Sequence, residues 1–432
     1  MPFDTQQPPA TLTRSSVAER RRARLLDATI EVAGERGWEA MTLAEVVARA
    51  GLSKRTVYDL FEDKRACFLA AARELIDRVS ALTLAEYRAA KTPRDGVEAS
   101  VRALLRFCGE SPAAARVYLV EIAAAGPDGA ALWREHMDSM SRRAAQALEP
   151  LRGDLPAHAG SMAVGGVYTV ARARLLAGQA RQLPALAPEV TEALCIALGI
   201  DPRGPGPAAA AGNRKGEVVP LRRERRPGQL AGGPHGMPRE QVEANQSRRI
   251  LAAMGELIAE HGYERTTVEL VIARAGVSRK TFYDLRGGRE QWFLLVCDAA
   301  ADRLLARLDA HSAPSGERRG HPADRAQRAA AALIDFCIDD PAGARICFVE
   351  TLAARADARA WRDALLDRVT AALAPGAAAN GDPAAAADGQ RAKLAASAAV
   401  GAVLELAGRR PEPLDRDYAT TLVTKVLAAG SA

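Results

Sequence analysis

The chain has 432 residues, which is enough for roughly two to four domains that each bury a core of their own. With 48% hydrophobic, 26% charged and 4% aromatic residues, its composition is typical of a soluble globular protein. No run of about 18 uncharged apolar residues occurs, so a membrane span is not expected. The net charge of +6 permits nucleic-acid binding without requiring it.

The first segment with a regular pattern is helical. Residues 1–14 are polar, and we expect them to form a flexible arm. Apolar residues at helical spacing then predict a helix from Val17 to Arg36, which Gly37 ends. Thr42-Leu-Ala-Glu45 has the pattern of a capping box and opens a second, short helix, and Gly51 supplies its left-handed C-terminal residue.

A third helix follows a tight turn. Ser53 is placed to cap a helix from Lys54 to Phe61, and Asp63 can cap a long fourth helix that begins at Lys64. Two short helices joined by such a turn are typical of a helix-turn-helix, which presents its second helix to the major groove of DNA. We therefore predict a DNA-binding head at residues 15–63, joined by the fourth helix to a helical domain at 64–200.

The same plan returns later in the chain. Ala48 to Asp59 and Ala273 to Asp284 are identical at eight of twelve positions. Similarity persists past the heads, since Pro112 to Glu121 aligns with Pro341 to Glu350. The whole half is therefore duplicated. We predict a second head at 244–288, a second regulatory domain at 289–430 and, from its Gly, Pro, Ala and Arg content, a disordered linker at 201–243.

The residues at the start of each third helix have the chemistry to read DNA. Arg and Lys donate to guanine O6 and N7, and Thr contacts either a base or a thymine methyl. Tyrosines one turn further on, and the threonines that open the second helices, can donate to the DNA backbone. These candidates are Thr42, Lys54, Arg55, Thr56 and Tyr58 in the first head and Thr267, Arg279, Lys280, Thr281 and Tyr283 in the second.

The first head resembles the TetR family of one-component bacterial transcription regulators. The matching residues are Gly37, Thr42, Ala50-Gly51-Leu52-Ser53, Thr56, Tyr58, Phe61, Lys64 and Phe68. The resemblance implies an all-α fold of two TetR-like units, each with a three-helix head joined by a long fourth helix to an antiparallel regulatory helix bundle. It also implies that Tyr58 and Lys64 contact phosphate and that residues 53–56 face the groove, with Ser278 and Arg289 in corresponding positions of the second head.

The second head departs from this pattern. Arg286 replaces Phe61, so an aromatic expected to pack between the third and fourth helices is missing. Gly287-Gly288 loosens the entry to the fourth helix, although Arg289 can still meet a phosphate. We therefore expect the second head to keep its fold better than its affinity for DNA.

The resemblance further implies how the regulatory domains assemble. The last two helices of each unit, about 156–181 with 186–199 and 390–409 with 413–429, would form a four-helix interface. Gly165, Gly166 and Gly401 would allow close approach there. Pairing inside one chain gives a pseudo-dimer, with its heads about 34–36 Å apart and a slightly asymmetric inverted-repeat operator. A homodimer of two chains remains the alternative.

A small-molecule effector bound within the bundle is implied by the same resemblance. Candidate ligand-binding residues are Tyr118, Glu121, Trp133, Met137 and Tyr168 in the first half and Phe348, Glu350 and Trp361 in the second. Ordinary core packing is the favoured interpretation of the aromatics. Glu121 and Glu350 each interrupt an apolar run at the same place, and either could instead pair with an arginine such as Arg116 or Arg345.

Other classes of function find little support. The chain has no dinucleotide-binding, phosphate-binding, nucleophile-elbow or zinc-protease motif, so we expect no enzyme, no catalytic residue and no cofactor. The six cysteines show no paired spacing and lie in apolar stretches, which predicts buried thiols in a reducing cytoplasm and no metal site. The N-terminus lacks the pattern of a secretory signal.

We therefore predict a cytoplasmic, sequence-specific DNA-binding transcription regulator, a ligand-responsive repressor whose partners are double-stranded DNA and a small-molecule effector. The alternative is a ligand-sensing or protein-interaction scaffold in which the second head, or both heads, no longer binds DNA.

Overall fold

The computed structural model describes residues 14–151, 158–198, 238–312, 322–374, 383–408 and 416–429, with the single positions 153, 155 and 200. Every regular element within these ranges is a helix, which confirms the all-α prediction. The predicted arm falls almost entirely outside the described residues, as does the predicted linker up to residue 237. No helix in the described ranges combines the length and apolar content needed to cross a membrane.

The first half consists of a head, a long connecting helix and a bundle. The head contains α1 (Arg14–Arg36), α2 (Leu43–Ala50) and α3 (Lys54–Leu60), and α4 (Lys64–Ala89) leads out of it. The remaining elements are α5 (Pro93–Glu110), α6 (Pro112–Arg116), the π-helical turn η1 (Val117–Glu121), α7 (Ile122–Ala124), α8 (Gly126–Leu148), α9 (Ala159–Leu176), the 3-10 helix η2 (Ala180–Leu186) and α10 (Ala187–Ala197).

The second half repeats this order. Its head contains α11 (Arg239–His261), α12 (Val268–Ala275) and α13 (Arg279–Arg286), followed by the connecting helix α14 (Arg289–Ser312). Its bundle contains α15 (Pro322–Asp339), α16 (Pro341–Arg345), the π-helical turn η3 (Ile346–Glu350), α17 (Thr351–Ala353), α18 (Ala356–Leu373), α19 (Pro383–Gly408) and α20 (Arg416–Ala429).

The helix ends of the first head follow the predicted capping residues. Thr42 Oγ1 accepts the backbone N–H of Glu45 at 3.3 Å, and the Glu45 carboxylate accepts the N–H of Thr42 at 3.1 Å, which completes the capping box. Gly51 has φ +61°, the left-handed conformation that favours glycine. Asp63 accepts the N–H of Ala66 at 2.7 Å and caps α4. These sequence predictions are confirmed.

Two helices start earlier than the sequence pattern indicated. The first begins at Arg14 rather than Val17. The second-half helix α11 begins at Arg239, inside the segment 201–243 that we predicted as linker. Its first turns are polar and therefore carry no apolar stripe, but Arg239 Nε donates to Glu243 at 2.7 Å, an i,i+4 pair that supports an exposed helix.

The aromatic expected to be missing from the second head has replacements at neighbouring positions. Phe282 and Trp292 are fully buried there, where the first head has Val57 and Cys67. Trp292 also donates its indole N–H to the Phe282 carbonyl at 3.0 Å, which joins α14 to α13. Two buried aromatics thus pack where the third and fourth helices of the second head meet, although neither stands at the position of Phe61.

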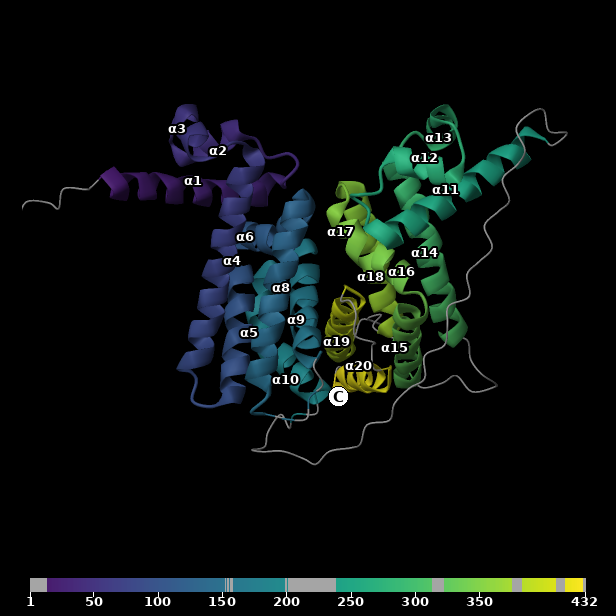
Figure 1. Cartoon of the computed structure of the whole chain (residues 1–432). Coiled ribbons are helices and arrows are strands. Elements are labelled where there is room, and N and C mark those ends of the chain that lie inside the picture. Colours follow the sequence, from purple (N-terminus) through teal and green to yellow (C-terminus); the bar gives the residue numbers. More distant parts are fainter. Residues whose placement is uncertain are drawn as a thin grey trace, which may run out of the picture.

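The two halves pack against each other through their last helices. Helix α9 crosses α19, and α10 packs on α20 (Figure 1). The crossing is close, since a Cβ added to Gly165 would lie 2.4 Å from the Gly401 carbonyl oxygen, and one added to Gly401 would lie 2.2 Å from that of Gly165. Beside it, Arg172 Nη2 donates to Asp363 at 3.2 Å across the halves. The predicted close approach at these glycines is confirmed.

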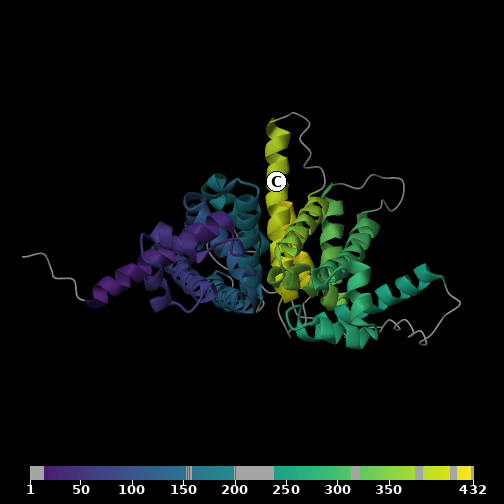
Figure 2. The same cartoon turned by 90° about the horizontal axis from the view of Figure 1, so that it is seen from above.

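This packing sets the overall arrangement. The two heads lie at the same end of the molecule, with α3 and α13 outermost (Figure 1), and the two bundles stand side by side when seen from above (Figure 2). All six cysteines are buried and free, as predicted. Burial raises the pKa of the Cys108 thiol to about 12.

Candidate functional site

The start of each third helix carries exposed basic side chains. Lys54 and Arg55 are exposed at the N-terminus of α3, and Arg279 and Lys280 are exposed at that of α13. Further along the same helices, Tyr58 is 63% exposed and Tyr283 is 42% exposed, a high value for aromatic side chains. These side chains are accessible to a duplex, which is the placement that base and backbone contacts require.

The serine and threonine of each turn hold the helix in place. Ser53 Oγ accepts the N–H of Thr56 at 3.2 Å and lies 2.9 Å from its hydroxyl. In the second head, Ser278 Oγ accepts the N–H of Thr281 at 3.0 Å and lies 2.9 Å from its hydroxyl. These four residues therefore cap and orient the basic helices, while their role as groove contacts stays a prediction. Thr42 and Thr267 are exposed caps of α2 and α12.

The two heads differ in how the first basic residue is held. Arg279 forms an ion pair with Glu269 on α12. The aligned position of the first head is Ala44, so Lys54 has no carboxylate at that place. The second head therefore presents less positive charge at the start of its third helix.

The predicted phosphate contacts at the start of the fourth helices are engaged within the protein. Lys64 Nζ lies 4.6 Å from the centroid of the Trp38 ring and donates to the Glu39 carbonyl at 3.0 Å. The Arg289 guanidinium stacks in the same way over Tyr263, with its central carbon 4.4 Å from the centroid of the ring. Burial lowers the pKa of Lys64, against the opposing effect of Glu39. Both cations brace the head against the fourth helix, and their contact with phosphate stays a prediction.

Sequence reasoning missed one pair of residues that shape the turn. Arg24 Nη2 donates to the carbonyl of Ala50, where α2 ends, at 2.6 Å. Arg249, its counterpart in the repeat, donates to the carbonyl of Gly276 at 2.7 Å. Their equal offset from the two turns was the available signal, but each stands next to or close to other arginines, which makes the pair hard to single out.

Buried glutamates join each head to its bundle. Glu121 ends the π-helical turn η1 and accepts the backbone N–H of Trp38 at 2.9 Å and the Arg116 guanidinium at 3.0 Å. Glu350 ends η3 and accepts the N–H of Tyr263 at 2.7 Å, and its carboxylate forms an ion pair with Arg345 Nη2 at 2.7 Å. Their side chains are only 5% and 8% exposed. Of the two interpretations left open by the sequence, pairing with arginine is the one observed.

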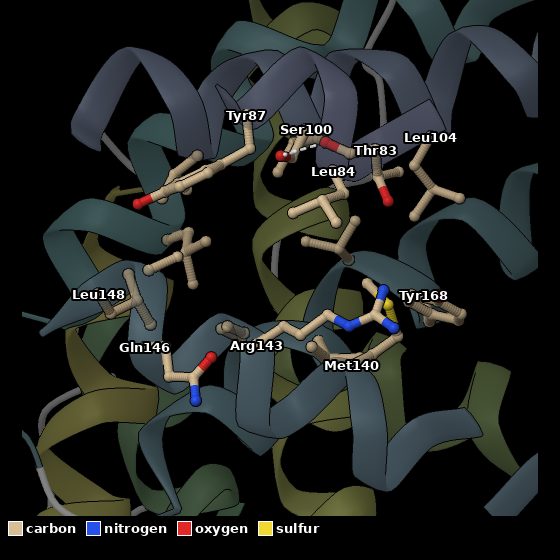
Figure 3. Close-up of a pocket in the computed structure, with 18 residues that line it drawn as sticks. Thr83, Leu84, Tyr87, Ser100, Leu104, Met140, Arg143, Gln146, Leu148 and Tyr168 are labelled. Carbon is tan, nitrogen blue, oxygen red and sulfur yellow. Dashed lines mark hydrogen bonds between the residues drawn. The ribbon is translucent and has the colours of Figure 1, made fainter. Parts of the chain in front are cut away.

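A cavity of about 250 Å³ opens among the helices of the first bundle (Figure 3). Helices α4, α5, α8, α9 and α10 surround it. The side chains that line it are Thr83, Leu84, Tyr87, Val97, Ser100, Val101, Leu104, Met140, Arg143, Ala144, Gln146, Ala147, Leu148, Ala163, Val164, Val167, Tyr168 and Leu194. The volume lies just below the range of about 300–1,000 Å³ that is usual for ligand sites.

Of the predicted ligand residues of the first half, Tyr168 lines this cavity, whereas Tyr118, Glu121, Trp133 and Met137 are not among its lining residues. Tyr118 and Tyr168 belong to a buried cluster with His136. The Tyr118 hydroxyl lies 2.7 Å from His136 Nε2, and the Tyr168 hydroxyl lies 3.1 Å from the same atom. Trp133 packs against this cluster, with its ring centroid 6.0 Å from that of Tyr118. Core packing is therefore the observed role of Trp133.

The second half lacks this polar cluster. Cys347, Ala364 and Leu404 stand where the first half has Tyr118, His136 and Tyr168. Phe348 is a buried core residue, and its carbonyl accepts the Arg362 guanidinium at 3.0 Å. Trp361 donates its indole N–H to Asp298 at 2.7 Å. The predicted ligand residues of the second half are thus held by neighbours within the protein.

Comparison with known proteins matches both heads to one family. A model described as bacterial regulatory proteins, tetR family, matches residues 25–71 and again residues 250–291. Both heads of this chain are therefore similar to the TetR-family DNA-binding domain, and the chain carries two TetR-like units. Each match spans the helix-turn-helix and the start of the fourth helix, the same regions that carry the exposed basic side chains.

The relatives of this chain each match less than half of it. HTH-type transcriptional regulator BetI of Rhizobium meliloti (strain 1021) is 34% identical over 97 residues, or 22% of this chain and 48% of the relative, so the match spans about half the relative's length. The regulator of fatty acid degradation FadR from Bacillus halodurans is 16% identical with a TM-score of 0.38, over 40% of this chain and 94% of that one. A putative TetR-family transcriptional regulator from Rhodococcus sp. is also 16% identical, with a TM-score of 0.37. The match covers 42% of this chain and 99% of that one.

Proposed function

We propose that this protein is a sequence-specific DNA-binding transcription regulator, a ligand-responsive repressor that reads an inverted repeat with two heads of one chain. The observation that carries the proposal is the pair of exposed basic helix starts, Lys54-Arg55 on α3 and Arg279-Lys280 on α13, at one end of the molecule. A duplex laid across that end can meet both helices, with Thr42, Thr267, Tyr58 and Tyr283 beside them for the backbone.

The packing of the halves supports a single chain as the DNA-binding unit. Helices α9 and α19 already occupy each other's interface, with backbone contact at Gly165 and Gly401. A second chain would have to displace this contact to form the same interface. Because the two heads are not identical, the two halves of the operator are expected to differ.

The head-to-bundle contacts support a ligand response. Glu121 reaches the backbone of Trp38 at the end of the head, and Tyr118 occupies the same π-helical turn, in contact with the cavity residue Tyr168. Single π-helical turns are frequent at functional positions. A ligand that moves Tyr168 therefore has a short, packed route to the first head.

The alternative function, a scaffold in which the second head no longer binds DNA, is favoured by one observation. Arg279 is paired with Glu269, which reduces the positive charge that this head offers to phosphate. The proposal keeps both heads on DNA, with the second head as the weaker one.

The test is selection of genomic DNA fragments by the full-length chain, followed by salt titration on the enriched fragment. A repressor of this kind enriches an imperfect inverted repeat and binds it with a steep salt dependence, about 0.9 in log–log slope for each phosphate contacted. Light scattering of the complex is expected to give one chain per repeat. Absence of enrichment, or salt-independent binding, would support the scaffold, and two chains per repeat would refute the single-chain unit.

A further inference from the structure

We propose that the cavity of the first bundle binds a small organic anion with an apolar body, and that the second half carries no counterpart of this site. The inference rests on the proposed ligand-responsive function and adds the chemistry and number of the effector sites.

The walls of the cavity are mainly apolar. Leu84, Val101, Leu104, Val164 and Val167 line it from α4, α5 and α9. A bound molecule must therefore present apolar surface to most of the cavity, since an unpaired polar group would lose its hydration without a partner there. One of the few hydroxyls, that of Ser100, donates to the Thr83 carbonyl at 3.0 Å and is already used within the protein (Figure 3).

Arg143 alone among the lining residues is charged. Its side chain runs along the cavity wall formed by α8, and the guanidinium lies beside Met140 and Tyr168 (Figure 3). A guanidinium presents a planar fork of donors that matches a carboxylate, sulfonate or phosphate. The geometry therefore selects an anionic head group at the Tyr168 end and the apolar body of the ligand in the remainder of the cavity.

The buried cluster beside Arg143 supplies no opposite charge to its guanidinium. Burial and the Arg143 charge lower the pKa of His136 to about 4, so the imidazole is neutral at pH 7. Burial raises the pKa of both Tyr118 and Tyr168, so the phenols are neutral as well. Of the three groups only Tyr168 lines the cavity, and its phenol can supply or accept a hydrogen bond at the head group without adding a charge.

The second half has lost each polar element of this arrangement. Ala371 aligns with Arg143, and Leu404 aligns with Tyr168. Cys347 and Ala364 replace the other two members of the cluster, and Cys347 is fully buried in the core. No cation remains at the aligned position to hold an anionic head group, so we infer one effector molecule per chain.

The test uses three eight-carbon probes with different head groups, octanoate, octanol and octylamine, titrated calorimetrically into the full-length chain. The proposal expects octanoate to bind with one molecule per chain and roughly tenfold more tightly than octanol, the gain of one charge-assisted hydrogen bond. Octylamine is expected to bind most weakly. Equal binding of octanoate and octanol, no binding of octanoate, or two molecules per chain would each overturn the proposal.

Three variants, one of them a control, locate the site. In Arg143→Gln, octanoate is expected to bind only as tightly as octanol. Arg142→Gln changes the adjacent arginine, which is exposed like Arg143 but lies outside the cavity lining, and this variant keeps the tenfold preference. Val167→Trp fills the cavity and is expected to abolish binding of both, with thermal unfolding as the check that the variant folds. Loss of the preference in Arg142→Gln but not in Arg143→Gln would place the anion elsewhere.

The proposed function and this site fail in different ways. If the chain enriches an inverted repeat but octanoate does not bind, the regulator stands and the effector class is wrong. If octanoate binds at Arg143 but no DNA is enriched, the site stands and the DNA-binding function is wrong.

Discussion

The two halves of this chain share a fold but differ in the polar side chains at the head and in the bundle. The first half keeps an exposed Lys54 and a lined cavity with a polar cluster beside it. In the second half Arg279 is paired with Glu269, and Cys347, Ala364 and Leu404 replace the cluster. The contact between head and bundle is nevertheless retained in both, through Glu121 and Glu350. The second half thus shares the fold of the first but lacks the polar groups that lie at and beside the cavity of the first half.

The largest expected effect tests how the second head keeps its fold. Trp292→Ala removes a fully buried side chain and its hydrogen bond to Phe282, and should destabilise the second head by about 3–5 kcal/mol. The aligned change Cys67→Ala removes a single sulfur atom from the first head and should destabilise that head far less. Hydrogen exchange of α13 and α3 measures the two effects separately. Similar losses in both variants would show that Trp292 does not take the place of the aromatic lost with Phe61.

This rebuilding marks the limit of prediction from sequence. The capping residues were predictable, because Thr42, Gly51, Ser53 and Asp63 act on backbone groups within a few residues. Arg286 correctly indicated that an aromatic had been lost from its position. Its replacement was not predictable from local pattern, because Phe282 and Trp292 meet only when α13 and α14 are packed together.

The acid sensitivity of the first bundle is the next largest effect. The pKa of His136 is lowered to about 4 from 6.5, mainly by burial, so the unfolded chain binds a proton in this range and the folded chain does not. The stability from this group is complete above pH 6.5 and is lost as the pH falls toward 4, by about 3 kcal/mol. Urea unfolding at pH 7 and at pH 4.5 should therefore show a smaller difference for His136→Gln than for the wild type.

The matched control is His261→Gln, which changes an imidazole whose side chain is 47% exposed at the end of α11. This variant should retain the pH dependence of the wild type. An unchanged pH dependence in His136→Gln would mean that carboxylates elsewhere account for the acid sensitivity.

Glu121 and Glu350 allow the two head contacts to be compared directly. Glu121→Gln and Glu350→Gln each keep an acceptor for a backbone N–H but lose the charge facing an arginine, at an expected cost of about 1–3 kcal/mol. Faster hydrogen exchange at Trp38 or Tyr263, respectively, would report the loosened contact. If octanoate in the cavity releases DNA by acting on the first head, only Glu121→Gln should reduce that release. An equal reduction in Glu350→Gln would show that both heads receive the signal.

The site was less predictable than the fold for a related reason. Tyr168, one of the predicted ligand residues, lines the cavity, but Arg143 carried no distinguishing signal, since it stands beside Arg142 on an amphipathic helix. The direction in which a surface arginine points depends on how α8 sits against α4 and α9. Glu121 stood out because it interrupts an apolar run, yet its partner, the N–H of Trp38, lies 83 positions away in the chain.

The smallest effect concerns the charge at the two reading helices. Glu269→Ala frees Arg279 and should strengthen DNA binding by up to about 1 kcal/mol, because an exposed ion pair holds the side chain only weakly. The reciprocal change, Ala44→Glu, introduces a carboxylate near Lys54 and should weaken binding by a similar amount. One additional phosphate contact would raise the salt slope by about 0.9, which a titration on the enriched repeat can resolve. If Glu269→Ala leaves both affinity and slope unchanged while Ala44→Glu reduces them, only the first head contacts DNA, and the difference between the halves extends from the effector cavity to the duplex.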